Sequence, residues 1–180
     1  MAKGIGYKTN LNYLQQFCNS LNIDFVVKEF EIENIESAGK TPCFLCSWHR
    51  RKALFDLTRD LGYSKLALGH HMDDALQTML MNMIYHGSIS SLPQKFSMFN
   101  DRLLLIRPLL DIPEQDLVDY AVQRKFPDQV KQCPYGEETG RKTMKNALAE
   151  LEKIYPVAKK NMYRAMDNIY IEYLPKRHKT

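Results

Sequence analysis

Short runs of aliphatic and β-branched residues alternate with amphipathic helical segments along this sequence, and this alternation restricts the fold most strongly. Such runs predict strands at 23–30, 65–69 and 102–107. Apolar residues that recur every three or four positions predict helices at 11–21, 47–61, 73–87 and from 111 onward. Strands that alternate with helices are typical of an α/β fold, in which helices cover both faces of a parallel sheet.

Composition narrows the class of protein further. The chain has 180 residues, of which 44% are hydrophobic and 26% are charged, close to the average of soluble globular domains. No apolar run approaches the roughly 20 residues of a membrane-spanning helix, and no basic and apolar leader opens the sequence. We therefore expect a soluble cytoplasmic protein that has no membrane partner.

Charge is distributed unevenly along the chain. Residues 141–180 contain ten Lys and Arg against four Asp and Glu, a balance of +6, whereas residues 1–140 contain fifteen against seventeen, a balance of −2. We predict an α/β domain over 1–140 and a basic helical extension over 141–180, with a helix break at Tyr155-Pro156. A basic extension indicates a polyanionic partner such as nucleic acid, although a solvated helical face would have the same composition.

The segment from Gly69 to Asp74 combines two imidazoles and two carboxylates at the junction of a predicted strand and a predicted helix. This junction is where α/β sheets bind ligands. Carboxylate oxygens at this position could hold the Mg²⁺ of a nucleotide. Acidic residues also stabilise the first turn of any helix, so part of the pattern has a purely structural explanation.

A second group of residues with chemical potential is the pair Cys43 and Cys46, followed by the basic run 50–52. We expect this C-x-x-C motif at the start of a helix that Ser47 could cap. The positive end of the helix and the nearby cations favour the thiolate, which binds metals and attacks sulfur. Two buried thiols without a function would give the same motif.

Cys133 lies in a segment with Pro134 and Gly136 that predicts an exposed loop. Three cysteines can hold a metal centre that keeps one position open for chemistry. His49 could instead complete a zinc site with three cysteines and one histidine. The remaining cysteine, Cys18, lies on the apolar face of the first predicted helix, and we expect it to contribute only to packing.

Four stretches of the sequence resemble the PP-loop ATP pyrophosphatase superfamily in order and spacing, across about residues 10–145. They are CFLCSWHRRKALF, KLALGHHMDDALQTMLMNM, LLLIRPLLDIPEQDL and the later C-P-Y-G loop. Within the superfamily, the sequence is similar to the tRNA 2-thiocytidine synthetase branch. The resemblance implies a parallel, Rossmann-like three-layer fold of the adenine nucleotide alpha hydrolase type.

The resemblance also implies two sets of site residues. The residues that would hold a [4Fe-4S] cluster, with one iron free to carry sulfide, are Cys43, Cys46 and Cys133. The residues that would line the nucleotide site are Gly69, His70, His71, Asp73 and Asp74. The catalytic set implied by the resemblance combines Cys43, Cys46 and Cys133 with Asp73 and Asp74.

In enzymes of this branch, ATP with Mg²⁺ adenylates the carbonyl oxygen of the target base, sulfur displaces AMP, and pyrophosphate is released. The resemblance therefore implies ATP-dependent thiolation of a cytidine in tRNA. The implied partners are tRNA, a sulfur donor such as a cysteine desulfurase, and a second copy of the chain. Two alternatives remain open: a non-catalytic, zinc-stabilised RNA-binding module, and a dithiol oxidoreductase that uses only Cys43 and Cys46.

The sequence departs from the superfamily in one respect, since it contains no SGGxDS motif, the loop that holds the phosphates of ATP. Three explanations are open: an N-terminally truncated enzyme, a loop supplied by another chain, or loss of ATP chemistry. Truncation is the simplest, because a missing central strand would leave open backbone edges. We accordingly expect a partial PP-loop domain over 1–140 and no release of pyrophosphate from ATP by this chain alone.

Overall fold

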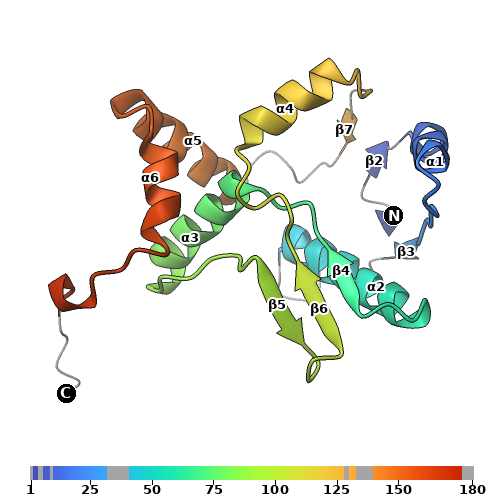
Figure 1. Cartoon of the computed structure of the whole chain (residues 1–180), viewed down its shortest axis with the longest axis horizontal. Helices are drawn as coiled ribbons and strands as arrows, with labels where there is room; N and C mark the ends of the chain where they lie inside the picture. Colours follow the sequence, from blue (N-terminus) through green and yellow to red (C-terminus); the bar gives the residue numbers. More distant parts are fainter. Residues whose placement is uncertain are drawn as a thin grey trace. The chain divides into compact units, whose positions relative to one another are not determined.

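The computed structural model describes residues 2–3, 6–8, 10–31, 41–127, 130–132 and 140–175 (Figure 1). The contacts within the chain divide it into two compact units. The first unit comprises Met1–Leu68, Lys95–Ile106 and Leu117–Thr139, and the second comprises Gly69–Gln94, Arg107–Asp116 and Gly140–Thr180. Across the described ranges, no helix combines the length and the apolar character needed to cross a bilayer.

The first unit contains a three-stranded sheet with the order β4-β6-β5, formed by β4 (Lys65–Ala67), β6 (Leu103–Ile106) and β5 (Lys95–Met98). β4 and β6 are parallel, as predicted, and β5 pairs with β6 in the antiparallel direction. Leu103 and Leu105 are buried while their neighbours are less so, because successive side chains of a strand point to opposite faces. β5 was not predicted, and it makes this sheet mixed.

The first unit also contains α1 (Leu11–Ser20) and α2 (Pro42–Asp60). Four short strands form two-stranded pairs: β1 (Ala2–Lys3) with β3 (Phe30–Glu31), and β2 (Gly6–Lys8) with β7 (Val130–Gln132). The predicted strand at 23–30 was wrong over 23–29, which have no regular secondary structure. β1 pairs only with Phe30 and Glu31, so the apolar residues before them have no neighbouring strand in the described structure.

The second unit is built around α3 (Met72–His86), α5 (Gly140–Ile154) and α6 (Ala158–Ala165). Its core consists of Met72, Leu76, Met79 and Leu148. The first two turns of α3 therefore pack internally, whereas Met83 and Ile84 near its end are exposed. The helix break predicted at Tyr155-Pro156 is confirmed, as is the end of α3 at Gly87, whose φ of +61° glycine adopts without strain.

The remaining helices are α4 (Glu114–Gln123), whose residues are divided between the two units, and the 3₁₀ turn η1 (Ile171–Tyr173). The predicted helix after Asp111 and Pro113 is confirmed by α4. The predicted domain boundary at residue 140 stays a prediction.

Candidate functional site

The start of α3 brings His71 and Asp74 together. His71 is the N-cap residue, with an extended backbone (φ −121°, ψ −179°), and its N–H donates to Asp74 Oδ2 at 3.1 Å. The imidazole Nε2 of His71 lies 3.3 Å from the same oxygen. Asp73 and Asp74 occupy the first turn, where carboxylates interact favourably with the helix dipole. Both carboxylates therefore lie in the first turn of the helix, as predicted for the junction between strand and helix.

Asp73 is 3% exposed, and both of its carboxylate oxygens bind groups of the chain itself. Oδ2 accepts a hydrogen bond from the backbone N–H of Glu114 at 2.8 Å, and Oδ1 lies 2.9 Å from Lys159 Nζ. Lys159 Nζ also lies 2.7 Å from Glu152 Oε2. Burial raises the pKa of Asp73, but the Glu114 N–H and Lys159 outweigh this effect and hold the pKa below its usual value. Asp73 is therefore an ionised anchor that connects α3 to α4 and α6.

Asp74 differs from its neighbour, because its side chain is 24% exposed. Arg141 Nη1 lies 3.6 Å from Asp74 Oδ1, and Arg141 Nη2 donates to Thr78 Oγ1 at 3.4 Å. The carboxylate of Asp74 is therefore the one in this pair that solvent or a ligand can reach.

His70 lies beside Arg107, the residue that directly follows β6. Arg107 Nε donates to His70 Nδ1 at 3.4 Å, which requires the proton of the neutral ring to sit on Nε2. Burial lowers the pKa of His70; Asp74 opposes this shift, while Arg107 and Arg141 add to it. His70 is thus a neutral imidazole near pH 7 that can donate from Nε2.

His71 Nδ1 is buried, and no group within the described part of the chain forms a hydrogen bond with it.

Taken as a whole, the start of α3 offers a reachable carboxylate, two guanidinium groups and a neutral imidazole donor. Carboxylate oxygens suit Mg²⁺, and guanidinium groups suit phosphate oxygens. This donor set fits a magnesium nucleotide.

The two cysteines of the C-x-x-C motif lie in the first two turns of α2. The expectation that Ser47 caps this helix was wrong: Thr41 Oγ1 accepts from the N–H of Phe44 at 3.3 Å, and Pro42 is the first helical residue. Proline suits that position because the N–H it lacks has no helical partner there. Cys43 is exposed and Cys46 is half-buried, and residues three apart share one face of a helix. Paired thiols on one face fit a soft metal centre.

Cys133, the third predicted ligand, lies outside the described residues. Inside the described ranges, no group of three or more His, Cys, Asp or Glu side chains could hold a metal ion. The three-cysteine site therefore stays a prediction, as does the zinc alternative that includes His49. Cys18 is half-buried on α1, in agreement with a packing role.

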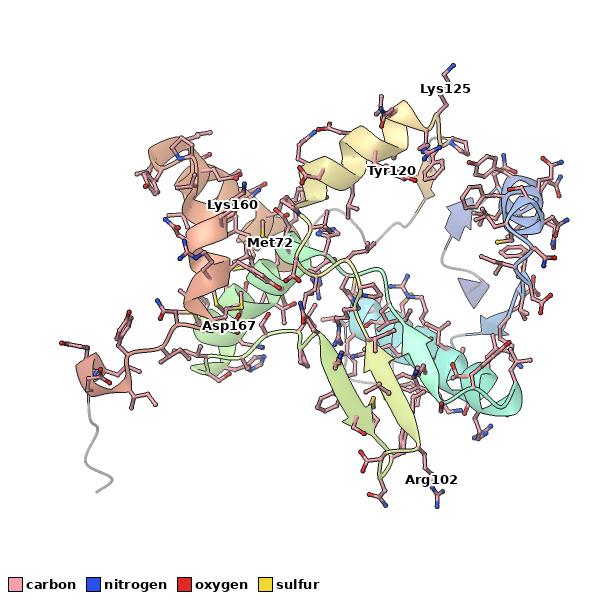
Figure 2. The ribbon with its side chains drawn as sticks, viewed as in Figure 1. Met72, Arg102, Tyr120, Lys125, Lys160 and Asp167 are labelled. Carbon is pink, nitrogen blue, oxygen red and sulfur yellow. The ribbon has the colours of Figure 1, made fainter. Side chains whose placement is uncertain are left out.

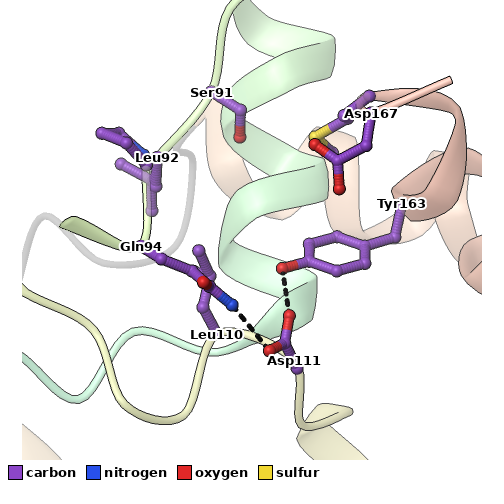
Figure 3. A pocket seen from close by; sticks show the side chains of 9 residues that line it. Ser91, Leu92, Gln94, Leu110, Asp111, Tyr163 and Asp167 are labelled. Carbon is purple, nitrogen blue, oxygen red and sulfur yellow. Dashed lines mark hydrogen bonds between the residues drawn. The ribbon is translucent and has the colours of Figure 1, made fainter.

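A pocket of about 430 Å³ lies in the second unit between the segment 91–94, Asp111 and α6 (Figure 3). Asp111 Oδ1 accepts from the hydroxyl of Tyr163 at 2.7 Å, and Oδ2 accepts from Gln94 Nε2 at 2.6 Å. Burial and the hydrogen bond to Asp111 raise the pKa of Tyr163. The hydroxyl therefore stays protonated, and Asp111 fastens α6 to the segment before α4.

A family model described as a PP-loop domain matches residues 7–130. The chain belongs to the PP-loop domain family. It is 41% identical over 133 residues to "tRNA-cytidine(32) 2-sulfurtransferase" of Coxiella burnetii (strain RSA 493 / Nine Mile phase I), covering 73% of this chain and 52% of that protein. It is 34% identical over 166 residues to the protein of the same name from Cytophaga hutchinsonii, covering 89% and 58%. The chain thus spans about half the length of the curated relatives it matches.

Among solved structures, the PP-loop chain is similar to the U34-tRNA thiolase NcsA from Methanococcus maripaludis with its [4Fe-4S] cluster. The TM-score is 0.70 and the identity 25%, and the match covers 94% of this chain and 59% of that chain. The predicted α/β, Rossmann-like fold class and the predicted resemblance are confirmed by these matches.

Four residues that build the PP-loop chain's site at α3 were not assigned to it by sequence reasoning: Arg107, Glu114, Arg141 and Lys159. A signal existed for Arg107, since it follows β6 just as the Gly69–Asp74 segment follows β4. Residues that follow parallel neighbouring strands leave the sheet at the same edge. Arg141 and Lys159 were counted only as part of the basic extension, and nothing in their own neighbourhood points to Asp73 or Asp74.

Proposed function

We propose that this chain belongs to an enzyme that uses ATP to replace a carbonyl oxygen of a cytidine in tRNA with sulfur. The observation that carries the proposal is the cluster at the start of α3, in which Asp74, Arg107 and Arg141 surround His70. The names of the relatives, tRNA-cytidine(32) 2-sulfurtransferase, supply the substrate class. The reaction would take place in the cytoplasm, where tRNA is used.

The proposed reaction has two steps. The carbonyl oxygen of the base first attacks the α-phosphorus of ATP, the bond to pyrophosphate breaks, and an adenylated base results. Sulfide then attacks the ring carbon that carries this oxygen, and AMP departs with the oxygen. Asp74 would hold Mg²⁺ through its oxygens. His70 would donate a hydrogen bond from Nε2 to a phosphate oxygen.

Asp73 has a different proposed role from Asp74. Asp73 is buried, and its oxygens bind Glu114 and Lys159, whereas Asp74 is partly exposed; we therefore assign Asp73 to positioning the first turn of α3 rather than to Mg²⁺. Gly69 and His71 would complete the wall of the nucleotide site, with His71 fixing Asp74 through its backbone N–H.

Cys43, Cys46 and Cys133 would hold a [4Fe-4S] cluster. When bound, such a cluster supplies a soft centre that can present sulfur to the activated base. The exposed position of Cys43 and the shared helix face of Cys46 suit thiolate ligation. A sulfur donor such as a cysteine desulfurase would replenish the sulfur consumed in each turnover.

The C-terminal helices would contribute to tRNA binding. Lys160 is exposed on α6 (Figure 2), and so is Arg164. Three other lysines of this region, Lys145, Lys153 and Lys159, are paired with carboxylates. Only cations without such a partner are available to neutralise phosphates at little cost. The basic residues Lys176, Arg177 and Lys179 lie outside the described residues.

The test is complementation. The protein that carries this chain is expressed in a bacterial strain that lacks 2-thiocytidine, and tRNA nucleosides are quantified by mass spectrometry. We expect 2-thiocytidine to appear, and to be lost with Asp74→Asn, Cys43→Ser and Cys133→Ser but not with the matched controls Asp167→Asn and Cys18→Ser. Zinc without iron, together with RNA binding and no thiolated base, would replace the proposal with the RNA-binding module.

A further inference from the structure

Arg107 is a half-buried guanidinium whose hydrogen bonds all involve uncharged groups. Its Nε donates to His70 Nδ1, its Nη1 donates to the carbonyl of Pro93, and its backbone N–H donates to the carbonyl of Gln94. These contacts fix the side chain at the carboxyl end of β6, next to the segment that opens α3. The guanidinium is therefore held in place before any ligand arrives.

The charges around this group set Arg107 apart from the other cations that lie close to the start of α3. Arg141 pairs with Asp74, Lys145 with Glu114, and Lys159 with Asp73 and Glu152. For Arg107, by contrast, no carboxylate within the described ranges lies within 4.0 Å. Burial lowers the pKa of Arg107, yet a guanidinium remains charged in proteins.

Withdrawing a charge from water, even in part, is costly unless an opposite charge accompanies it. Arg107 lies at the edge of the site, so a negatively charged ligand bound there would supply the missing opposite charge. The flat, forked guanidinium matches the oxygens of a phosphate group and can form two parallel hydrogen bonds with it. The neighbouring Nε2–H of the neutral His70 is a further donor suited to the same anion.

We propose that Arg107 is a phosphate ligand that acts beside Asp74 at the start of α3. This inference rests on the proposed function, because the phosphate would come from the nucleotide or from the tRNA backbone. It assigns a binding role to a residue outside the Gly69–Asp74 segment. It also separates two charges of opposite sign in one site: Asp74 for a divalent cation and Arg107 for the anion.

The test measures binding by the purified chain in titration calorimetry with three probes: tripolyphosphate, magnesium ATP, and an anticodon stem–loop RNA. Arg107→Gln should weaken binding of the phosphate probe about tenfold or more, the effect of losing one charged hydrogen-bonded contact. Arg107→Lys, which keeps the charge but loses the fork, should fall between Arg107→Gln and the wild type. Arg102→Gln is the matched control, because Arg102 is exposed at the turn between β5 and β6 (Figure 2).

The probes distinguish the source of the phosphate. Parallel losses with tripolyphosphate and magnesium ATP assign it to the nucleotide. A loss confined to the RNA, with a salt slope reduced by about one, assigns it to the tRNA backbone. Thermal melting of each variant without ligand shows whether it is folded, and Arg107→Lys keeps the test valid if Arg107→Gln unfolds.

The inference is overturned if Arg107→Gln, or Arg107→Lys where the first variant is unfolded, binds every probe as tightly as the wild type. It is also overturned if the wild-type chain binds none of the probes. Failure of the proposed function looks different: phosphate binding would depend on Arg107, but no 2-thiocytidine would appear in the complementation experiment.

Discussion

At the start of α2, two cysteines lie within one helical segment, whereas at the start of α3 two carboxylates are bound by groups far along the chain. Thr41 and Pro42 define the first site locally, and the side chain of Cys43 is exposed. The second site depends on contacts with Glu114 and Lys159, which reach Asp73 from α4 and α6.

This difference between a local site and a site held by distant residues separates residues that bind ligands from residues that stabilise the fold. A local, exposed site can lose a side chain without disturbing the core, because few other groups depend on it. A buried carboxylate whose partners come from other helices contributes to the packing of the whole unit. Substitutions of the cysteines at the start of α2 should therefore change cofactor content but not folding stability. Substitution of the buried carboxylate at the start of α3 should lower the stability of the fold.

The largest expected effect is on metal content. Cys43→Ser or Cys46→Ser should abolish the brown chromophore and the iron and sulfide content after anaerobic reconstitution, while the free energy of unfolding changes by about 0.5 kcal/mol or less. Cys18→Ser is the control and should retain iron. A colourless protein with one zinc that is lost in His49→Ala would contradict the iron–sulfur prediction.

Next in size is the loss of stability on removing the buried carboxylate. Asp73→Ala leaves Lys159 without one partner and the Glu114 N–H without an acceptor, so we expect the free energy of unfolding to fall by about 2–4 kcal/mol. Urea denaturation followed by circular dichroism measures it. Asp167→Ala, at an exposed position on the same unit, should lie within about 0.5 kcal/mol of the wild type. Equal midpoints for both variants would remove the distinction between the two helix starts.

Protonation of Asp73 in acid should also lower the free energy of unfolding. The pKa of Asp73 in the folded chain is below its ordinary value of 3.8, so its stabilising contribution is complete above pH 3.8 and is lost as pH falls through the folded pKa. We expect unfolding free energy to decline in this window. In Asp73→Asn the decline should be shallower than in Asp167→Asn; identical acid profiles would contradict the assignment.

The adjacent carboxylate should behave in the opposite way. Asp74→Asn should cost only about 1 kcal/mol or less, because the group is partly solvated and its ion pair with Arg141 is long. The same variant should nevertheless lose magnesium-dependent binding of ATP in calorimetry. If Asp73→Asn, once shown to be folded, lost that binding while Asp74→Asn kept it, the proposed roles of the two carboxylates would have to be exchanged.

The smallest effect is expected at an exposed ion pair of the same unit. Lys145 Nζ lies 2.7 Å from Glu114 Oε2, but the two side chains are 58% and 35% exposed. Lys145→Met should therefore change the free energy of unfolding by about 0.5 kcal/mol or less, and Lys159→Met by several times that amount. Similar values for the two lysines would show that burial does not decide the strength of these pairs.

Much of the fold was predictable from the sequence. The helix at 73–87 and the strands at 65–69 and 102–107 carry their own periodicity, and residues next to them in sequence supply their boundaries. The strand at 23–30 failed because strand formation depends on a partner, which β1 supplies only at Phe30 and Glu31. β5 was missed because its short KFSM segment has a weak pattern of its own and is defined by pairing with β6.

The candidate site was likewise predictable where local sequence patterns define it, and unpredictable where distant residues do. His70 and Asp74 stand at a strand–helix junction, which local patterns reveal. Arg107 meets His70 across 37 positions of sequence, and Glu114 meets Asp73 across 41, so their roles depend on the tertiary fold. The buried state of Asp73 was unpredictable for the same reason, since two neighbouring carboxylates are indistinguishable until their partners are known.

The bond between Lys159 and Asp73 also has a consequence for how the chain folds during synthesis. At about 5–20 residues per second, the ribosome completes α6 several seconds after α3. Until α6 is made Asp73 keeps its hydration, and until α5 is made the apolar face around Leu76 lacks Leu148 as its cover. Such late contacts between distant segments slow folding and leave a nascent chain open to aggregation or chaperone capture. Folding of the second unit in cells should therefore respond to translation speed and to chaperones.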